Sequence, residues 1–450
     1  MSSFYIENFG CRATQADGAA LESQFLQRGL ERAPTARDAE IVVLNTCTVT
    51  SGADKDARAS IRRVQRENPG CRILVTGCYA QRAPQELAAM PGVSWVVGNS
   101  HKHLAAAIAA AEVSPPAAGF VPLDHLAGPG SRADVIVGDI FAHTRLLAAP
   151  VFDAANERTR PNLKVQDGCG NRCSFCVIPS VRGQSRSMPL DRVLEEIRTL
   201  VRASYREVVI SGINLGRWGR DLKASLRLET MVRAILERTA LEKLRVSSVE
   251  PMDWSDRLIA LMAGSGRVAR HAHVPLQSGS DAVLRRMHRK YRPWHYREKI
   301  WKIHDAMPHA AIGADVMVGF PGETEAEFAE TLGMVEELPF TYLHVFTYSA
   351  RPGTAAASDP NQVPVRVARE RNQTLREIAA GKKHAFMRAQ VSRTVQAITL
   401  ASGGEGFTEG LTDHYLKVRI PGRLQPNQWM DLSIAGADGE FLLAHGPRSV

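Results

Sequence analysis

The chain has 450 residues, of which 44% are hydrophobic, and this composition excludes a disordered protein. No run of about 18 uninterrupted apolar residues occurs, so no membrane-spanning helix is expected. A formal net charge of +9 favours a polyanionic partner such as nucleic acid. The first residues lead directly into a strand pattern and not into a signal peptide, which predicts a cytoplasmic protein with reduced cysteines.

A strand pattern precedes each of Cys11, Cys47 and Cys78. Because strands and helices alternate in this region, we expect an open parallel sheet whose strands end at one common edge. The three thiolates should meet at that edge and form a three-ligand site, for which a 4Fe-4S cluster is the most economical occupant. The strands are expected at residues 4–10, 41–46 and 72–77, and the helices at residues 16–28, 52–67 and 81–90.

Cys71 comes before its strand and not after it. It should lie at the opposite edge of the sheet, as a structural or surface thiol without a cluster role. Residues 103–160 are rich in Ala, Pro and Gly, which predicts a connector with some local structure. We therefore expect an N-terminal domain over residues 1–112 and a connector over residues 113–160.

Cys169, Cys173 and Cys176 lie within eight residues, in the spacing Cys-x3-Cys-x2-Cys. Tetrahedral zinc and electron-transfer clusters want four protein ligands, whereas three cysteines leave one iron of a 4Fe-4S cluster open to bind a substrate. A structural zinc site or a disulfide is the alternative, although reduced cysteines favour metal or catalytic roles. The segment resembles the signature of the radical S-adenosylmethionine superfamily, including Phe175 before the last cysteine.

Six further strand and helix pairs predict a partial (β/α)6 barrel over residues 161–362. Chemistry in such barrels is built on the loops at the carboxyl ends of the strands, and the three-cysteine loop directly follows the first strand. The strands are expected at residues 163–166, 207–211, 244–248, 273–276, 312–318 and 342–348. The helices are expected at residues 189–203, 228–238, 256–262, 281–287, 294–307 and 323–336.

The other strand ends of this barrel are where S-adenosylmethionine should be held. Glycine lets the backbone approach a ligand, while Glu250 and Gln277 could bond ribose hydroxyls or the methionine amine. The alternative is that these positions are simply turns and helix caps. The candidate cofactor-binding residues are Gly212, Glu250, Gln277, Ser278 and Gly319.

The chain ends in a long basic helix over residues 363–390 and a small all-β barrel over residues 391–450. The helix could be a solvated face or could bind a phosphate backbone. Short strands at residues 394–400, 415–420 and 428–434, with Gly-rich turns, indicate the barrel. Exposed aromatic and basic residues on such barrels often bind nucleic acid. The candidates here are Phe407, His414, Tyr415, Lys417 and Arg419.

With the three parts in this order, the whole chain resembles the methylthiotransferase family, which has an N-terminal cluster domain, a radical S-adenosylmethionine barrel and a C-terminal TRAM domain. Residues 45–50 and 410–418 resemble the branch that modifies N6-threonylcarbamoyladenosine in tRNA (MtaB type). One residue departs from the family pattern: Thr14 stands where relatives usually carry Asn. This leaves the local hydrogen bonding around Cys11 in doubt.

The resemblance implies two 4Fe-4S clusters, one on Cys169, Cys173 and Cys176 and the other on Cys11, Cys47 and Cys78. The first would cleave S-adenosylmethionine to a radical that attacks C2–H of adenine, and the second would present the sulfur that is methylated and transferred. The implied partners are the tRNA anticodon stem-loop, with its base at position 37, and an electron donor such as flavodoxin or ferredoxin. The remaining alternatives are an isopentenyladenosine or ribosomal-protein methylthiotransferase, and a nonenzymatic, zinc-containing RNA-binding protein.

Overall fold

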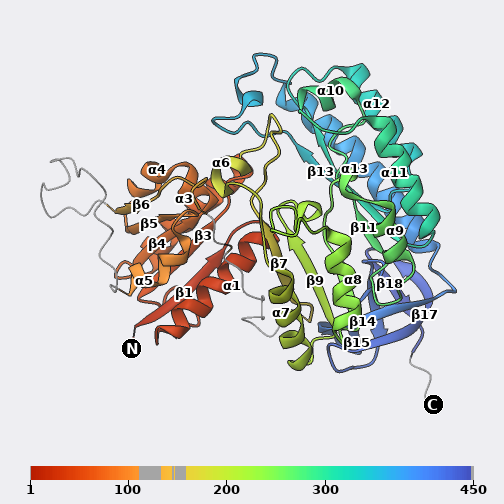
Figure 1. Cartoon of the computed structure of the whole chain (residues 1–450), viewed down its shortest axis with the longest axis horizontal. Helices are drawn as coiled ribbons and strands as arrows, with labels where there is room; N and C mark the ends of the chain where they lie inside the picture. The colour runs from red at the N-terminus through yellow and green to blue at the C-terminus, as the bar shows by residue number, and fades with distance from the viewer. Residues whose placement is uncertain (1, 111–132, 144–145, 147–158, 447–450) are drawn as a thin grey trace, which may run out of the picture.

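Three structural parts follow one another along the chain, in the order that the sequence predicts (Figure 1). The computed structural model describes residues 2–110, 133–143, 146 and 159–446. A parallel sheet is followed by a partial barrel, a long helix and a small closed barrel. The predicted α/β architecture is therefore confirmed. None of the described helices combines the length and the apolarity that a membrane crossing requires.

The N-terminal part is one six-stranded parallel sheet in the order β2-β1-β3-β4-β5-β6, with a hydrophobic core on each face. β3 is buried along its whole length, as a central parallel strand should be. The strands are β1 Ser3–Asn8, β2 Glu31–Arg32, β3 Ile41–Thr46, β4 Arg72–Gly77, β5 Val93–Gly98 and β6 Asp134–Ile136. The helices are α1 Arg12–Gln27, α2 Ser51–Glu67, α3 Cys78–Arg82, α4 Pro84–Ala88 and α5 Ala105–Ala109.

Strand β6 lies inside the segment that the sequence assigns to the connector. It pairs in parallel with β5, so the N-terminal sheet continues beyond residue 112. The sequence pattern missed this strand because three residues are too few to show a period of two. Much of the remaining connector lies outside the described residues, and the domain limits at residues 112 and 160 stay a prediction.

The central part contains the six parallel strands of a partial barrel, divided between two sheets. The orders are β10-β9-β7-β8, with β8 as a short antiparallel edge, and β11-β12-β13. The strands are β7 Asn162–Asp167, β8 Arg186–Ser187, β9 Glu207–Gly212, β10 Lys243–Val246, β11 His271–His273, β12 Ala311–Val318 and β13 Tyr342–Thr347. The helices are α6 Ile178–Arg182, α7 Leu190–Arg202, α8 Leu228–Arg238, α9 Asp256–Ala263, α10 Asp281–Arg286, α11 Pro293–Ala306 and α12 Glu325–Glu337.

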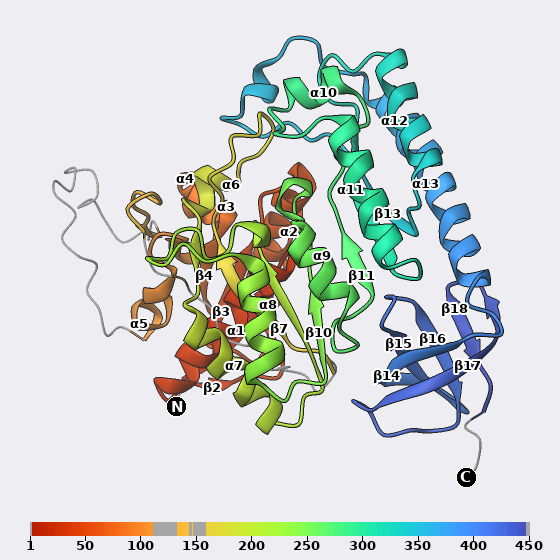
Figure 2. The ribbon, with the colours of Figure 1, turned by 45° about the vertical axis from the view of Figure 1, so that its right-hand side comes forward.

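Helix α13, Val365–Arg388, links the central part to the C-terminal barrel. Figure 2 shows it running beside α12 and β13 before the chain enters the barrel. The barrel closes in the order β14-β15-β16-β18-β17. Its strands are β14 Thr394–Gly404, β15 Phe407–Thr412, β16 Lys417–Pro421, β17 Trp429–Asp438 and β18 Phe441–Ala444.

The basic charge of α13 is only partly available to a partner. Arg371 is buried and donates to the Glu323 carboxylate over 2.8 Å. Lys382 donates to the backbone oxygens of Glu336 and Leu338, both over 2.9 Å. These cations fasten the helix to the central part, so the predicted phosphate-binding face is smaller than the sequence suggests.

Candidate active site

The loop that carries Cys169, Cys173 and Cys176 leaves the carboxyl end of β7 in a tight turn. Gly168 has φ +70, and a Cβ there would lie 2.0 Å from the backbone oxygen of Gln184, so this position requires glycine. The Cys169 sulfur accepts hydrogen bonds from the Asn171 backbone over 3.4 Å and from the side chain of Asn214 over 3.5 Å. Donors of this kind stabilise a thiolate that ligates metal.

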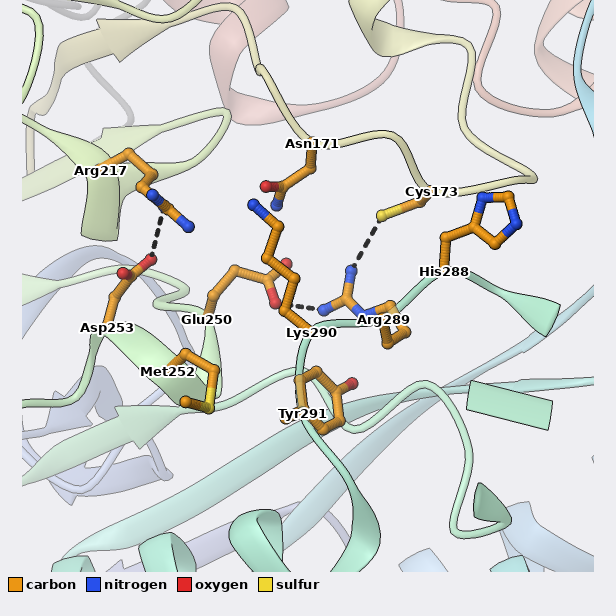
Figure 3. Close-up of a pocket in the computed structure, with 10 residues that line it drawn as sticks. All are labelled: Asn171, Cys173, Arg217, Glu250, Met252, Asp253, His288, Arg289, Lys290 and Tyr291. Carbon is orange, nitrogen blue, oxygen red and sulfur yellow. Dashed lines mark hydrogen bonds and ion pairs between the residues drawn. The ribbon is translucent and has the colours of Figure 1, made fainter. Parts of the chain in front are cut away.

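Beside this loop lies a narrow cavity in which Arg289 stands between Cys173 and Glu250 (Figure 3). Its guanidinium donates to the Cys173 sulfur over 3.3 Å and also pairs with the Glu250 carboxylate. Burial raises the pKa of Glu250, and Arg289 opposes that shift. The geometry fixes a carboxylate directly beside a cysteine of the loop.

The five residues predicted to bind S-adenosylmethionine are not equivalent in the structure. Glu250 lines the cavity, and Gly212 ends β9, where a Cβ would lie 2.8 Å from the Gln166 side chain. The backbone of Gln277, with φ 65, bridges to Val316 of β12. Of the five predicted residues, Glu250 is the one that lines the cavity beside Cys173.

Ser278 and Gly319 have local structural partners instead. The Ser278 hydroxyl lies 3.1 Å from that of Thr331 on α12. Gly319 donates its backbone N–H to Glu323, and a Cβ at this position would lie 2.5 Å from the Cβ of Ala368 on α13. The turn and packing roles that the sequence left open as an alternative are therefore present at both positions.

Cys11, Cys47 and Cys78 come together at the carboxyl edge of the N-terminal sheet, as predicted. Burial raises the pKa of Cys47 to about 11, and the neighbouring Cys78 and Cys11 contribute to the shift. Close approach is possible because Gly10 has no side chain: a Cβ there would lie 2.9 Å from the Cys47 sulfur. The side chain of Asn99 donates to the Cys78 sulfur over 3.5 Å.

Thr14 and Cys71 resolve two points that the sequence left open. The Thr14 hydroxyl lies 3.5 Å from the Cys11 sulfur, so the residue that departs from the family pattern is within hydrogen-bonding distance of the predicted ligand. Cys71 is buried in the core at the amino end of β4. It is a structural thiol and not a surface one.

The spacing of the sulfurs distinguishes a cluster from a single metal ion. A tetrahedral zinc with Zn–S bonds of about 2.3 Å would hold its sulfurs about 3.8 Å apart. Among the described residues, the group whose ligand atoms all lie within 4.8 Å of one another is His273, Asp315 and His344, and neither cysteine trio meets that limit. A polynuclear cluster, whose sulfurs are spread around several irons, fits both cysteine sites better than zinc does.

The two cysteine sites are neighbours. Cys78 shares one hydrophobic cluster with Val177 and Val181, and Val177 directly follows Cys176. Asn99, which donates to the Cys78 sulfur, also donates to the backbone oxygen of Val181 over 2.7 Å. The edge of the N-terminal sheet therefore packs onto the segment that follows the three-cysteine loop.

A buried charge network also joins the two parts, and the sequence analysis did not find it. Asp17 of α1 pairs with Lys102 over 2.9 Å, with Arg182 over 2.9 Å, and with Lys164 of β7. Asp167 accepts from Lys164 and Arg182, each over 2.9 Å. Burial would raise the pKa of Asp17, but the three cations hold it well below its usual range. With Arg186, which lies 3.9 Å from Asp167, four cations face two carboxylates here, which leaves positive charge beside the cysteines.

The inner face of the partial barrel is polar. His273, Asp315 and His344 lie on adjacent strands, whereas the alternate residues of β12 pack into the hydrophobic core. Two buried polar atoms near the carboxyl end of β9 have no hydrogen-bond partner within the described residues: Ser211 Oγ and Asn214 Oδ1. Buried polar atoms are nearly always paired, so these positions fit a bound polar ligand such as S-adenosylmethionine or a nucleobase.

Two of the predicted RNA-binding residues of the C-terminal barrel face inward. His414 is buried, and the Tyr415 hydroxyl accepts from Arg12 over 3.1 Å while its ring lies 5.1 Å from that of His271. Phe407, Lys417 and Arg419 remain on the barrel surface, where Arg419 stacks on Phe407 at 5.2 Å. Tyr415 is half-buried and faces the central part, and its role in nucleic-acid binding stays a prediction.

Comparison with known proteins identifies the family of the chain. Residues 3–98 match a family described as "Uncharacterized protein family UPF0004", and residues 163–335 match the "Radical SAM superfamily". The threonylcarbamoyladenosine tRNA methylthiotransferase MtaB of Bacillus subtilis (strain 168) is 36% identical over 434 residues, covering 94% of this chain and 91% of that protein. The chain belongs to the methylthiotransferase family.

This methylthiotransferase is also similar to relatives with another named substrate. The tRNA-2-methylthio-N(6)-dimethylallyladenosine synthase of Erythrobacter litoralis is 32% identical, covering 89% of this chain and 87% of that protein. The solved structure of the radical S-adenosylmethionine methyltransferase TsrM from Kitasatospora setae aligns with a TM-score of 0.55 at 15% identity. The alignment covers 79% of this chain and 77% of that one, and it confirms the fold.

Family membership makes the chain a radical S-adenosylmethionine enzyme that uses two 4Fe-4S clusters. The nonenzymatic, zinc-containing RNA-binding protein is thereby wrong. The sulfur spacing agrees with this outcome, because neither cysteine trio is as compact as a zinc site.

Proposed function

We propose that this methylthiotransferase installs a 2-methylthio group on N6-threonylcarbamoyladenosine at position 37 of tRNA. The observation that carries the proposal is the proximity of the two cysteine sites: Cys78 shares one hydrophobic cluster with Val177, the residue that follows Cys176. A reaction that removes hydrogen from a carbon and puts sulfur on the same carbon needs both functions beside one substrate atom. The named substrate of the 36% identical relative supports the choice of base.

The cysteine assignments follow from the same arrangement. Cys169, Cys173 and Cys176 would hold the cluster that works with S-adenosylmethionine, since their loop lies at the carboxyl edge of the barrel. Cys11, Cys47 and Cys78 would hold the sulfur-donating cluster. When bound, these groups supply radical chemistry at an unactivated C–H bond and a source of sulfur.

The protein's own residues orient these groups. Arg289 holds Cys173 and Glu250 in one fixed array, and Glu250 is the residue best placed to bond S-adenosylmethionine. Asn214 donates to Cys169, and its free Oδ1 is available to a ligand. The buried ion pair between Asp17 of α1 and Lys164 of β7 fastens the N-terminal sheet to the first strand of the barrel.

The RNA partner would be an anticodon stem-loop, whose unpaired bases are extruded at low cost. Exposed Lys417 and half-buried Phe407 and Arg419 form a basic and aromatic surface on the C-terminal barrel that suits such a ligand. Electrons for the reaction would come from a small donor such as flavodoxin or ferredoxin, and the chain is expected to act in the cytoplasm. Binding through phosphates predicts an affinity that falls steeply with salt.

The test is nucleoside analysis of bulk tRNA from a strain that lacks this enzyme. Loss of 2-methylthio-N6-threonylcarbamoyladenosine, with accumulation of its unthiolated precursor, is the expected result. Loss of the isopentenyl counterpart would instead assign the enzyme to the isopentenyladenosine branch, which the 32% identical relative represents. Unchanged tRNA nucleosides together with a modification lost from a ribosomal protein would indicate the third branch, the ribosomal-protein methylthiotransferases.

A further inference from the structure

A cavity of about 480 Å³ lies where all three parts of the chain meet. Cys11 and Arg12 line it from the N-terminal part, Arg160 and Val209 from the central part, and Leu400 from the C-terminal barrel. None of the described residues that line it is acidic. Cys11 belongs to the predicted sulfur-donating site, so a ligand inside this cavity would lie next to that site.

Arg12 brings positive charge to this cavity without a carboxylate partner among the described residues. It directly follows Cys11, is exposed, and donates from Nη2 to the Tyr415 hydroxyl over 3.1 Å. The Tyr415 ring lies 5.1 Å from the ring of His271 on β11, which places the guanidinium close to the inner wall of the barrel. An arginine has five N–H donors in a planar fork, and the hydrogen bond of Arg12 to Tyr415 uses one of them. Other donors of the fork can therefore bind a ligand.

The second arginine of the cavity is already engaged. Arg160 lies 3.6 Å from the buried carboxylate of Glu207, and Arg245 binds the same carboxylate over 2.6 Å. Arg160 Nη1 makes no hydrogen bond among the described residues, but the charge of Arg160 is offset by Glu207. Arg12 is therefore the cation of the cavity without a carboxylate partner among the described residues. Tyr415 holds it in place, which reduces the conformational entropy that binding would cost.

The distance between this cavity and the three-cysteine loop is one that a modified adenine could span. Val209 lines it and lies three residues before Gly212, the end of β9, which corresponds to about 10 Å along the strand. Asn214, just beyond that end, contacts Cys169. An adenine whose C2 lies between the two cysteine sites carries its N6 substituent on the far side of N1, directed away from the reacting edge. The cavity is placed to receive that substituent.

We propose that Arg12 binds the carboxylate of the substrate's threonyl group and that this cavity selects an anionic N6 substituent. The inference rests on the proposed function and adds to it the residue that recognises the substrate. A threonylcarbamoyl group ends in a carboxylate, which matches the guanidinium fork with two parallel hydrogen bonds. An isopentenyl group is a hydrocarbon, and it would displace water from Arg12 without offering any partner for its charge.

The experiment measures binding of three fluorescent anticodon stem-loop RNAs to the anaerobically reconstituted full-length enzyme. The RNAs carry N6-threonylcarbamoyladenosine, the same nucleoside with the carboxylate replaced by a neutral carboxamide, or unmodified adenosine. The wild-type enzyme should bind the carboxylate RNA about 10-fold to 100-fold more tightly than the carboxamide RNA. Arg12→Gln should remove this preference and leave the affinity for the carboxamide RNA unchanged.

Two further variants keep the test decisive. Tyr415→Phe removes the hydroxyl that orients Arg12 and should reduce the preference without abolishing it. Arg423→Gln removes an exposed arginine of the C-terminal barrel and should keep the preference whole. Iron content is measured for every variant, because Arg12 adjoins Cys11; if Arg12→Gln loses iron, the Tyr415→Phe result decides.

The outcomes separate the inference from the function beneath it. An Arg12→Gln variant that weakens all three RNAs equally, with a salt slope smaller by about one, would assign Arg12 to a phosphate and overturn the proposal. A wild-type enzyme that methylthiolates the threonylcarbamoyl RNA but binds the carboxamide RNA equally well overturns the inference alone. An activity assay with S-adenosylmethionine and a fourth RNA that carries N6-isopentenyladenosine completes the test: a wild-type enzyme that methylthiolates only this RNA overturns both.

Discussion

The two three-cysteine sites of this molecule are constructed in different ways. Cys169, Cys173 and Cys176 lie in one loop after β7, so short-range geometry brings their sulfurs together. Cys11, Cys47 and Cys78 follow three separate strands and meet only because β1, β3 and β4 are parallel neighbours. The first site depends on a loop and the second depends on a folded sheet, so the two should respond differently to damage.

Their electrostatic surroundings differ as well. At the loop site, Arg289 is matched by the Glu250 carboxylate. At the sheet site, Lys102, Lys164 and Arg182 outnumber Asp17 and Asp167, and the surplus charge lies near Cys78 and Cys11. Positive charge stabilises thiolates and the anionic cluster that they hold. The sheet site is thus held by charges that come from both parts of the chain.

The largest effect is expected from removing a ligand at one site while the other stays intact. Cys173→Ala should abolish cleavage of S-adenosylmethionine and reduce the iron content from about eight to about four per chain. Cys47→Ala should show the same iron loss but retain cleavage. Anaerobic iron analysis and detection of 5′-deoxyadenosine provide the measurement. Cleavage that disappears in both variants would show that the sites are not separable.

The charge network should be the next most sensitive point, because it joins the two sites. Asp17→Ala leaves four buried cations with one carboxylate, and it should lower the free energy of unfolding by about 3–5 kcal/mol. Asp56→Ala, on the exposed face of α2, is the matched control and should change it by less than about 0.5 kcal/mol. Urea unfolding of the apoprotein measures both. Equal effects of the two substitutions would contradict the role of the network.

The same network predicts the pH dependence of stability. The pKa of Asp17 and that of Asp167 are held below their unfolded values, because the cations outweigh the effect of burial. Their contribution is therefore fully present above about pH 4 and is lost as the pH falls toward the folded pKa. Urea midpoints measured between pH 3 and pH 7 should decline on the acid side. Asp17→Asn should flatten that decline, and an unaltered curve would exclude this carboxylate as its source.

A smaller effect is expected at the loop site when only its carboxylate is changed. Glu250→Gln leaves Arg289 without its anionic partner and should weaken S-adenosylmethionine binding about 10-fold, the cost of one charge-assisted hydrogen bond. Glu250→Asp should recover part of that loss. Equilibrium dialysis with labelled cofactor gives the affinity, and the iron content should stay the same. An unchanged affinity in Glu250→Gln would remove this residue from the cofactor site.

Cys71→Ser should have the smallest effect. The thiol is buried at the amino end of β4, away from the edge where the three ligand cysteines meet. A hydroxyl in this core should cost about 1 kcal/mol of stability and leave iron content and cofactor cleavage unchanged. Iron analysis beside Cys78→Ser makes the contrast direct. Iron loss in Cys71→Ser would refute the placement of the cluster at the carboxyl edge.

The predictions that succeeded depend on patterns that are local or repeated. Strands β3 and β4 were placed to the residue, because continuous apolar runs bounded by polar residues define central parallel strands. The convergence of Cys11, Cys47 and Cys78 followed from one topological rule. Strand β6 was missed, since its three residues follow a long connector and obtain their structure only from pairing with β5.

The sequence by itself determined the order of the three parts, the two sets of cysteines and the family, because spacing and periodicity survive in a linear string. Tertiary structure alone decided that Ser278 and Gly319 serve packing, that Tyr415 turns inward to hold Arg12, and that Asp17 lies among three cations. Each of these contacts joins residues far apart in the chain. Their energies depend on burial and on partner distance, which no local pattern of residues encodes.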